Sequence, residues 1–205
     1  MMKPLILGAM IMAALAACSP STSRAPDTPQ LGSGNVCGDP ALFGEVLGVV
    51  EGPGACGVTD AVSLRSVSGI ELSTAAVMDC NTARALRTWV DTGLVPAVGD
   101  TGGGISSIRV AAHYVCRTRN NQPGARLSEH ANGRAIDISA IVLRDGQEIS
   151  VENDWGRGDF GQRLRRMWRS ACGPFGTVLG PDGDRFHQNH FHFDTAQHGN
   201  GSFCR

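Results

Sequence analysis

The chain has 205 residues, a length that suits one domain or at most two small ones. Its 18 basic and 19 acidic side chains give a formal net charge of −1, which argues against a nucleic-acid-binding protein that relies on bulk electrostatics. Apolar residues make up 41% and charged residues 18% of the chain, so it can bury a core and is not disordered throughout.

The first 17 residues have the pattern of an export signal. A basic start at Lys3 precedes an apolar stretch, residues 5–17, which is shorter than the ~20 residues of a membrane span. Residues 15–18 (Leu-Ala-Ala-Cys) then resemble the bacterial lipoprotein box, which implies cleavage before Cys18 and acylation of its sulfur. Ser19, rather than Asp, follows the cysteine, which in such lipoproteins permits sorting to the outer membrane. We therefore expect a lipoprotein of a bacterial cell envelope that faces the periplasm; an ordinary signal peptide that contains a cysteine is the alternative.

The rest of the chain divides into a linker and one folded part. Residues 18–36 are rich in Ser, Pro, Thr and Gly, which predicts a flexible tether. From Cys37 onward there is no second linker and no internal repeat, so we expect residues 37–205 to form one domain.

An even number of cysteines remains after Cys18: Cys37, Cys56, Cys80, Cys116, Cys172 and Cys204. In an exported chain this indicates three disulfides, and a thiolate metal site is disfavoured because no Cys-x-x-Cys pair is present. Several pairings fit the spacing. The set that we expect joins Cys37 to Cys56, Cys80 to Cys116 and Cys172 to Cys204.

Apolar spacing predicts two amphipathic helices. In residues 74–90 the apolar side chains recur on one stripe, and Ser73 or Thr74 is placed to cap the helix. Residues 160–172 repeat this pattern, with Asp159 as the expected cap.

Alternating or short apolar runs predict the strands. Residues 105–116 alternate, and the apolar run 135–143 leads through an Asp145-Gly146 turn into residues 148–151. Residues 175–179 and 191–194 are two further short strands. The order of helices and strands indicates an α+β fold, with a small antiparallel sheet packed with helices and stapled by disulfides.

Histidine and aspartate side chains gather in two segments. His130 and Asp137 lie close in sequence, with Gly133 between them to bend the chain. His190 and His192 lie at a predicted strand, where side chains two residues apart point to the same face. Two imidazoles and one carboxylate are a common catalytic Zn²⁺ set that leaves a fourth position open for water. A further histidine can then serve as general base near neutral pH.

These segments resemble known zinc peptidases. The pattern Ser-x-His-x-x-Gly-x-Ala-x-Asp at 128–137, followed by His-x-His at 190–192, resembles the lysostaphin / D-Ala-D-Ala carboxypeptidase / hedgehog (LAS) group. The spacing of His187, His190 and His192 is similar to that of the penicillin-insensitive murein endopeptidases. Over nearly the whole domain the chain resembles the bacterial extensin-like C-terminal domain family, through residues 114–120, 128–137, 172–181 and 187–194. The resemblance implies a hedgehog/D-Ala-D-Ala-peptidase-like fold.

The resemblance also assigns roles to individual residues. It makes His130, Asp137 and His192 the ligands of one Zn²⁺ ion per chain. In the LAS group the first histidine of His-x-His lies beside the water as base, which here is His190.

Three other residues receive supporting roles. Arg117 lies where carboxypeptidase relatives carry an arginine that polarises the scissile carbonyl or binds a carboxylate. Simple pairing of Arg117 with an acid such as Asp194 is the alternative. His187 is expected near the ligands or the substrate, and Ser128 is expected to hold a ligand or the local turn by hydrogen bonding.

The carboxylate base of the carboxypeptidases is absent, because Asn189 stands where they carry Glu before the last ligand. The expected function is a zinc-dependent peptidoglycan peptidase that hydrolyses a bond of the stem peptide or cross-link with metal-activated water and a histidine base. A non-catalytic cell-wall-binding or structural envelope lipoprotein that keeps the fold and the metal site is the alternative. The expected partners are peptidoglycan and, through the lipid anchor, a membrane, with no nucleic acid.

Overall fold

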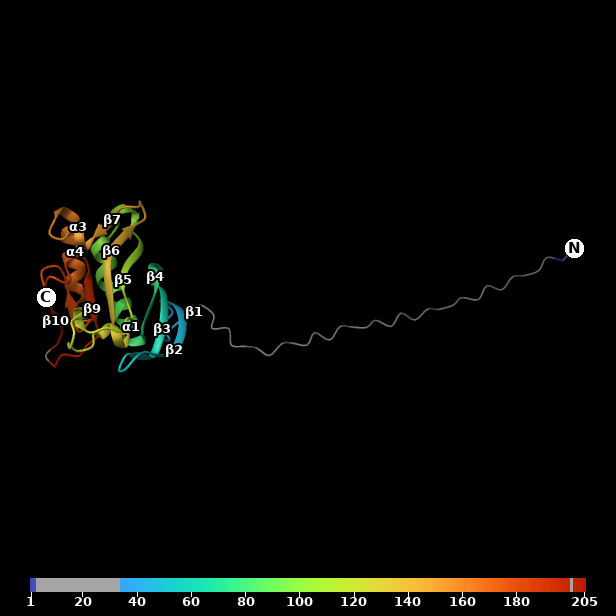
Figure 1. Ribbon diagram of the computed structural model, residues 1–205. Coiled ribbons are helices and arrows are strands. Elements are labelled where there is room, and N and C mark those ends of the chain that lie inside the picture. Colours follow the sequence, from blue (N-terminus) through green and yellow to red (C-terminus); the bar gives the residue numbers. More distant parts are fainter. Residues whose placement is uncertain (3–33, 200) are drawn as a thin grey trace. The chain divides into compact units, whose positions relative to one another are not determined.

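The computed structural model describes residues 1–2, 34–199 and 201–205 of the protein (Figure 1). The expected signal peptide of residues 1–17, the lipidation site Cys18 and most of the expected tether lie outside these residues, apart from the first two. Gly34 and Asn35 already form a strand and Val36 is buried, so the folded part begins earlier than Cys37. None of the helices among the described residues is long and apolar enough to cross a membrane.

The described residues form a ten-stranded sheet in the order β1-β2-β3-β4-β5-β6-β9-β8-β10, with β7 also paired to β6. The strands are β1 (Gly34–Asn35), β2 (Leu42–Glu51), β3 (Gly57–Val67), β4 (Ile70–Asp79), β5 (Ile105–Ala112), β6 (Ala135–Leu143), β7 (Glu148–Ser150), β8 (Thr177–Leu179), β9 (Phe191–Asp194) and β10 (Phe203–Cys204). The pairs β4–β5 and β8–β10 are parallel, and the other pairs are antiparallel. The α+β class is therefore confirmed, but the expected small antiparallel sheet is instead a ten-stranded mixed sheet.

Helices and short turns connect the strands (Figure 1). The α-helices are α1 (Cys80–Trp89), α2 (Val95–Val98), α3 (Val151–Asp154) and α4 (Gly158–Ala171). A π-helical turn, η1 (Val90–Leu94), joins α1 to α2, and the 3₁₀ turns are η2 (Thr101–Gly103), η3 (Arg119–Asn121) and η4 (Glu129–Asn132).

The first part of the helix predicted over residues 74–90 is a strand. Residues 74–79 belong to β4, where residues 76–79 pair with β3, and α1 begins only at Cys80. The cap is neither Ser73 nor Thr74 but Asp79, whose carboxylate accepts a hydrogen bond from the backbone N–H of Thr82 at 2.7 Å. The apolar stripe thus combines a strand with the helix that follows it.

The second predicted helix is present as α4, with a different start. Its N-cap residue is Arg157, whose side chain makes no capping bond, and Asp159 lies in the first turn, where it pairs with Arg163 at 2.7 Å. The helix packs against α1, and the two are joined by a hydrogen bond: the buried indole N–H of Trp89 on α1 donates to the carbonyl oxygen of Met167 on α4 at 2.8 Å. The aromatic ring of Trp89 also meets that of Phe193 on β9, with ring centroids 5.1 Å apart.

The side chains of β6 and β9 point alternately to the two faces of the sheet. The two strands are antiparallel, with Ile136 opposite Phe193 and Asp137 opposite His192. Residues directly opposite each other share a face, so the apolar pair faces the helices with Trp89, and the polar pair faces the other side. The candidate site therefore lies on the sheet face that α1 and α4 do not cover.

Most strand predictions agree with the structure. The strand at β6 and that at β9 have the predicted bounds, and the Asp145-Gly146 turn leads into β7 as expected. The predicted strand 105–116 ends at Ala112, because the chain then leaves β6 and the backbone N–H of Tyr114 donates to Val77 of β4. The strand predicted over 175–179 is shortened to Thr177–Leu179.

Three disulfides are present among the described residues, as predicted, but two of the expected pairings are wrong. The bonds join Cys37 to Cys80, Cys56 to Cys116 and Cys172 to Cys204. The antiparallel run of β2, β3 and β4 was not predicted from the sequence. This run brings the start of α1 beside residue 37 and the β2–β3 turn beside residue 116, where the Cys116 sulfur lies 3.7 Å from the Pro53 carbonyl oxygen.

Candidate metal centre

The structure brings His130, Asp137 and His192 together as a possible set of metal ligands. The Nε2 atom of His130 lies 3.1 Å from Oδ1 of Asp137 and 3.2 Å from Nδ1 of His192. The same Nδ1 atom of His192 lies 2.8 Å from Oδ1 of Asp137. All three side chains are buried, so they are shielded from bulk water.

Local backbone structure places each of the three. His130 lies on η4, which ends at Gly133 in the left-handed conformation with φ of 66°. This turn sends the chain into β6, so that Asp137, the third residue of that strand, returns to face His130. His192 is the residue of β9 directly opposite Asp137.

Each histidine is oriented through its other ring nitrogen. The Nδ1–H group of His130 donates to the backbone carbonyl oxygen of His113 at 2.8 Å. The Nε2–H group of His192 donates to Oδ2 of Asp194 at 3.0 Å. Such outer partners fix the tautomer and ring orientation of metal-binding histidines. They leave Nε2 of His130 and Nδ1 of His192 aimed at Asp137.

The three groups strongly perturb one another's ionisation. Burial raises the pKa of Asp137, but hydrogen bonds from His130 and His192 outweigh it and hold that pKa well below its ordinary value. Burial lowers the pKa of His192, but its hydrogen bonds to Asp137 and Asp194 outweigh burial and raise that pKa to about 9. The centre is thus built around an ionised, buried carboxylate.

This donor set fits Zn²⁺. Tetrahedral Zn²⁺ with nitrogen and oxygen ligands at about 2.0–2.1 Å separates neighbouring ligand atoms by about 3.3 Å. The separations of 2.8, 3.1 and 3.2 Å lie close to that value. Two imidazoles and one carboxylate are also a donor set typical of catalytic zinc sites.

His190 and Arg117 lie beside the carboxylate. Nε2 of His190 is 3.6 Å and Nη2 of Arg117 is 3.9 Å from Oδ2 of Asp137. The Nδ1–H group of His190 donates to the side-chain oxygen of Asn189 at 2.7 Å, which leaves Nε2 as the free acceptor. Burial is the largest influence on His190 and lowers the pKa of its imidazole, which outweighs the attraction of Asp137. The ring is therefore neutral at pH 7.

The two predicted supporting residues also lie here. His187 is buried, donates from Nδ1 to Oδ1 of Asp184 at 2.7 Å, and has its ring centroid 5.6 Å from that of His192. Ser128 is buried and lines a pocket together with His187 and Arg117. Its backbone N–H donates to the Arg117 carbonyl oxygen at 3.0 Å. Ser128 therefore ties the segment that carries Arg117 to the turn that carries His130.

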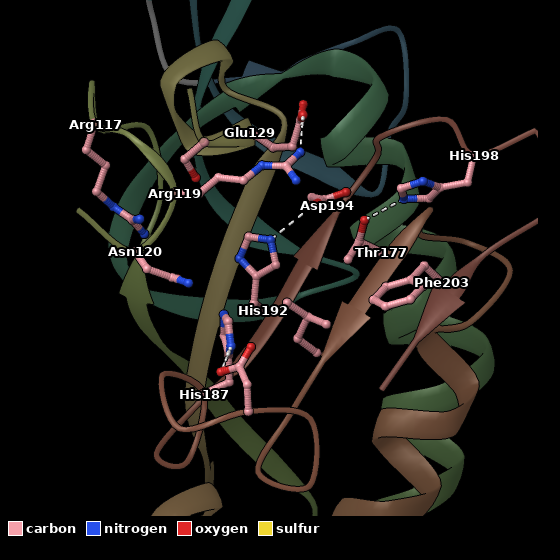
Figure 2. A pocket seen from close by; sticks show the side chains of 13 residues that line it. Arg117, Arg119, Asn120, Glu129, Thr177, His187, His192, Asp194, His198 and Phe203 are labelled. Atoms are coloured by element: carbon pink, nitrogen blue, oxygen red, sulfur yellow. Dashed lines mark hydrogen bonds and ion pairs between the residues drawn. The ribbon is translucent and has the colours of Figure 1, made fainter. Parts of the chain in front are cut away.

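A pocket of about 390 Å³ opens beside His192 (Figure 2). Arg117 and Arg119 reach it from one loop, and Thr177, His198 and Phe203 line its far end. Sequence reasoning assigned no role to Arg119 or to Asp184. The sequence could have indicated Arg119, because side chains two residues apart in an extended segment point to the same side, and Arg117 lies two residues earlier.

Comparison with known proteins assigns the chain to a family. A family model described as "Extensin-like protein C-terminus" matches residues 42–205. No curated protein and no solved structure matches the chain.

Proposed function

The chain belongs to the extensin-like protein C-terminus family, and we propose that it is a zinc-dependent peptidase that cuts a peptide bond in peptidoglycan. The bond would lie in the stem peptide or the cross-link. One observation carries the proposal: His130 and His192 each use one ring nitrogen for support and aim the other at the buried carboxylate of Asp137. That arrangement is what a three-ligand catalytic zinc site requires.

In this proposal Nε2 of His130, a carboxylate oxygen of Asp137 and Nδ1 of His192 would hold the ion. Zn²⁺ in such a site lowers the pKa of a coordinated water to about 7 and polarises a peptide carbonyl. The sequence order of these residues, and their similarity to the LAS motifs, support a relationship to that group of peptidases and to its fold.

His190 is the proposed general base. Its neutral ring offers Nε2 as a proton acceptor, and that atom lies 3.6 Å from Oδ2 of Asp137, beside the ligands. The lowered pKa matches the need for a base that is unprotonated at neutral pH. After bond cleavage the protonated ring can return the proton to the leaving amine.

Arg117 is the proposed electrostatic partner of the reacting carbonyl. Its side chain is only 24% exposed, and its guanidinium lies 3.9 Å from Asp137, on the pocket wall. A positive charge held there stabilises the negative charge that develops on the carbonyl oxygen during attack. The planar, permanently charged group suits this task better than lysine does.

The choice of substrate comes from the proposed location. A lipoprotein tethered through Cys18 in the cell envelope meets peptidoglycan as its nearest abundant peptide polymer. Residues 1–17 are then the signal peptide and the segment that follows Cys18 is the tether.

The test is digestion of purified peptidoglycan sacculi by the zinc-loaded protein, with released muropeptides separated and identified by mass spectrometry. We expect soluble peptide products, their loss on chelation and their loss in His190→Ala. That variant should retain its zinc and its thermal stability, because His190 is not a ligand. A folded, zinc-loaded protein that releases nothing from sacculi or defined peptides would overturn the peptidase and favour a non-catalytic cell-wall-binding role.

A further inference from the structure

The loop between β5 and η4 presents two arginines to the pocket. Thr118 and Leu127 form an antiparallel bridge, and the backbone N–H of Arg119 donates to the carbonyl oxygen of Arg126 at 2.9 Å. Side chains alternate along such a ladder, so Arg117 and Arg119 lie on the same side of it, opposite to Thr118. Both line the pocket beside His192, and Figure 2 shows their guanidinium groups among its lining side chains.

The charges of these arginines have different surroundings. Arg117 lies close to the ionised Asp137 and belongs to the proposed catalytic centre. Arg119 has Glu129 as its acidic neighbour, but the Nη2–Oε1 distance of 3.7 Å is longer than a hydrogen bond. The other oxygen of Glu129 already forms an ion pair with Arg134 at 2.8 Å.

Arg119 therefore has N–H groups that no pocket carboxylate accepts at hydrogen-bond distance. Because Arg134 neutralises Glu129, the positive charge of Arg119 is only partly compensated. The other pocket carboxylates are engaged, since Asp184 binds His187 and Asp194 binds His192. The side chain of Arg119 is 55% exposed, so its fork of N–H groups remains open to a ligand.

We propose that Arg119 binds a free carboxylate of the peptide substrate and so selects acidic peptides over their amidated counterparts. This rests on the proposed function, because the peptide bond to be cut must lie at the neighbouring metal centre. A guanidinium can form two parallel hydrogen bonds to a carboxylate, whereas a carboxamide offers one acceptor and no charge. Arg119 thus supplies specificity while Arg117 and His190 act on the reacting bond.

The test is a binding measurement that does not depend on turnover. Stem-peptide analogues, each with one free carboxylate converted to the carboxamide, are titrated calorimetrically into the zinc-loaded His190→Ala protein. We expect one of these amidations to weaken binding by about tenfold or more, as charged hydrogen bonds do. Adding Arg119→Gln should bring the acid-to-amide affinity ratio close to one, and Arg119→Lys should give an intermediate ratio.

Arg126→Gln is the matched control, because it removes the same charge from the same loop at a residue that is exposed and outside the pocket lining. It should leave the ratio unchanged. Equal affinity for acids and amides, no binding of any analogue, or a ratio that survives Arg119→Gln would overturn the inference. The sacculus digestion tests the proposed function separately. Cleavage of sacculi without a carboxylate preference in the titrations refutes only the role of Arg119. A carboxylate preference without cleavage refutes only the peptidase.

Discussion

Nε2 of His130 and Nδ1 of His192 lie 3.2 Å apart. In each ring the other nitrogen makes the hydrogen bond that orients the imidazole. The opposite nitrogens donate to the His113 carbonyl oxygen and to Asp194. A backbone group and a carboxylate, from different parts of the chain, therefore fix both tautomers. The consequence is a preorganised pair of ring nitrogens beside one buried carboxylate, which is the basis of the metal-site proposal.

Asp194 is predicted to strengthen metal binding without touching the ion. Asp194→Asn removes the negative charge that accepts the Nε2–H group of His192, so the ring becomes a weaker ligand. We expect the dissociation constant for Zn²⁺ to rise by about tenfold or more, with little change in the circular dichroism spectrum. Asp184→Asn is the control, because it breaks a similar pair with the non-ligand His187. Equal effects of the two substitutions on zinc affinity would contradict the role of Asp194.

Zinc affinity should keep rising with pH beyond neutrality. The pKa of His192 is raised to about 9, so below that pH the ring carries a proton that Zn²⁺ must displace. The apparent affinity should therefore increase by up to about tenfold per pH unit between pH 7 and 9, where an ordinary histidine is already largely deprotonated. Calorimetry in buffers of different ionisation enthalpy measures the protons released. A zinc affinity that does not change above pH 7 would contradict a raised pKa of His192.

Gly133 is predicted to be needed both for its conformation and for its lack of a side chain. Its φ is 66°, and a Cβ atom there would lie 2.6 Å from Cγ2 of Val58. Gly133→Ala should lower the free energy of unfolding by about 2 kcal/mol or more, because backbone strain and a steric clash add. Gly146→Ala has a similar positive φ of 87° with nothing within 4 Å, so it should cost about 1 kcal/mol. Chemical denaturation measures both, and equal losses would show that the contact with Val58 is unimportant.

The Cys56–Cys116 bond is predicted to contribute most among the disulfides, because it closes the longest loop, with a sequence separation of 60. Loop-closure entropy of that size corresponds to about 4 kcal/mol of stability. The double variant Cys56→Ser/Cys116→Ser should lose about that amount in denaturant titrations. The matched variant Cys172→Ser/Cys204→Ser opens a separation of only 32 and should lose somewhat less. The reverse ranking would contradict the loop-length argument.

Sequence periodicity predicted the elements that carry the chemistry better than those that support them. β6 is a mostly apolar run, and β9 alternates phenylalanine with a polar residue, so both have clear bounds. The two strands pair with Asp137 opposite His192. The run of β2, β3 and β4 escaped prediction because its strands contain β-bulges and interrupted alternation. The same omission led to two wrong disulfide pairings, since that run decides which cysteines meet.

The supporting residues of the site depend on contacts distant in sequence. His113 meets His130 through its backbone, so no side-chain motif could identify it. Glu129 is paired with Arg134 five residues later, and only the folded loop shows that Arg119 is left with a longer contact. Motif spacing therefore indicates the ligands, whereas the charge balance of the pocket requires the tertiary structure.

The most direct test of the proposed metal centre is to locate the ion. Crystals of the protein grown with zinc, measured at wavelengths above and below the zinc absorption edge, give an anomalous difference map that shows the ion itself. We expect one strong peak about 2.0–2.2 Å from Nε2 of His130, an Oδ atom of Asp137 and Nδ1 of His192. A well-ordered site with no zinc peak among these three atoms, or a peak held by other residues, would contradict it.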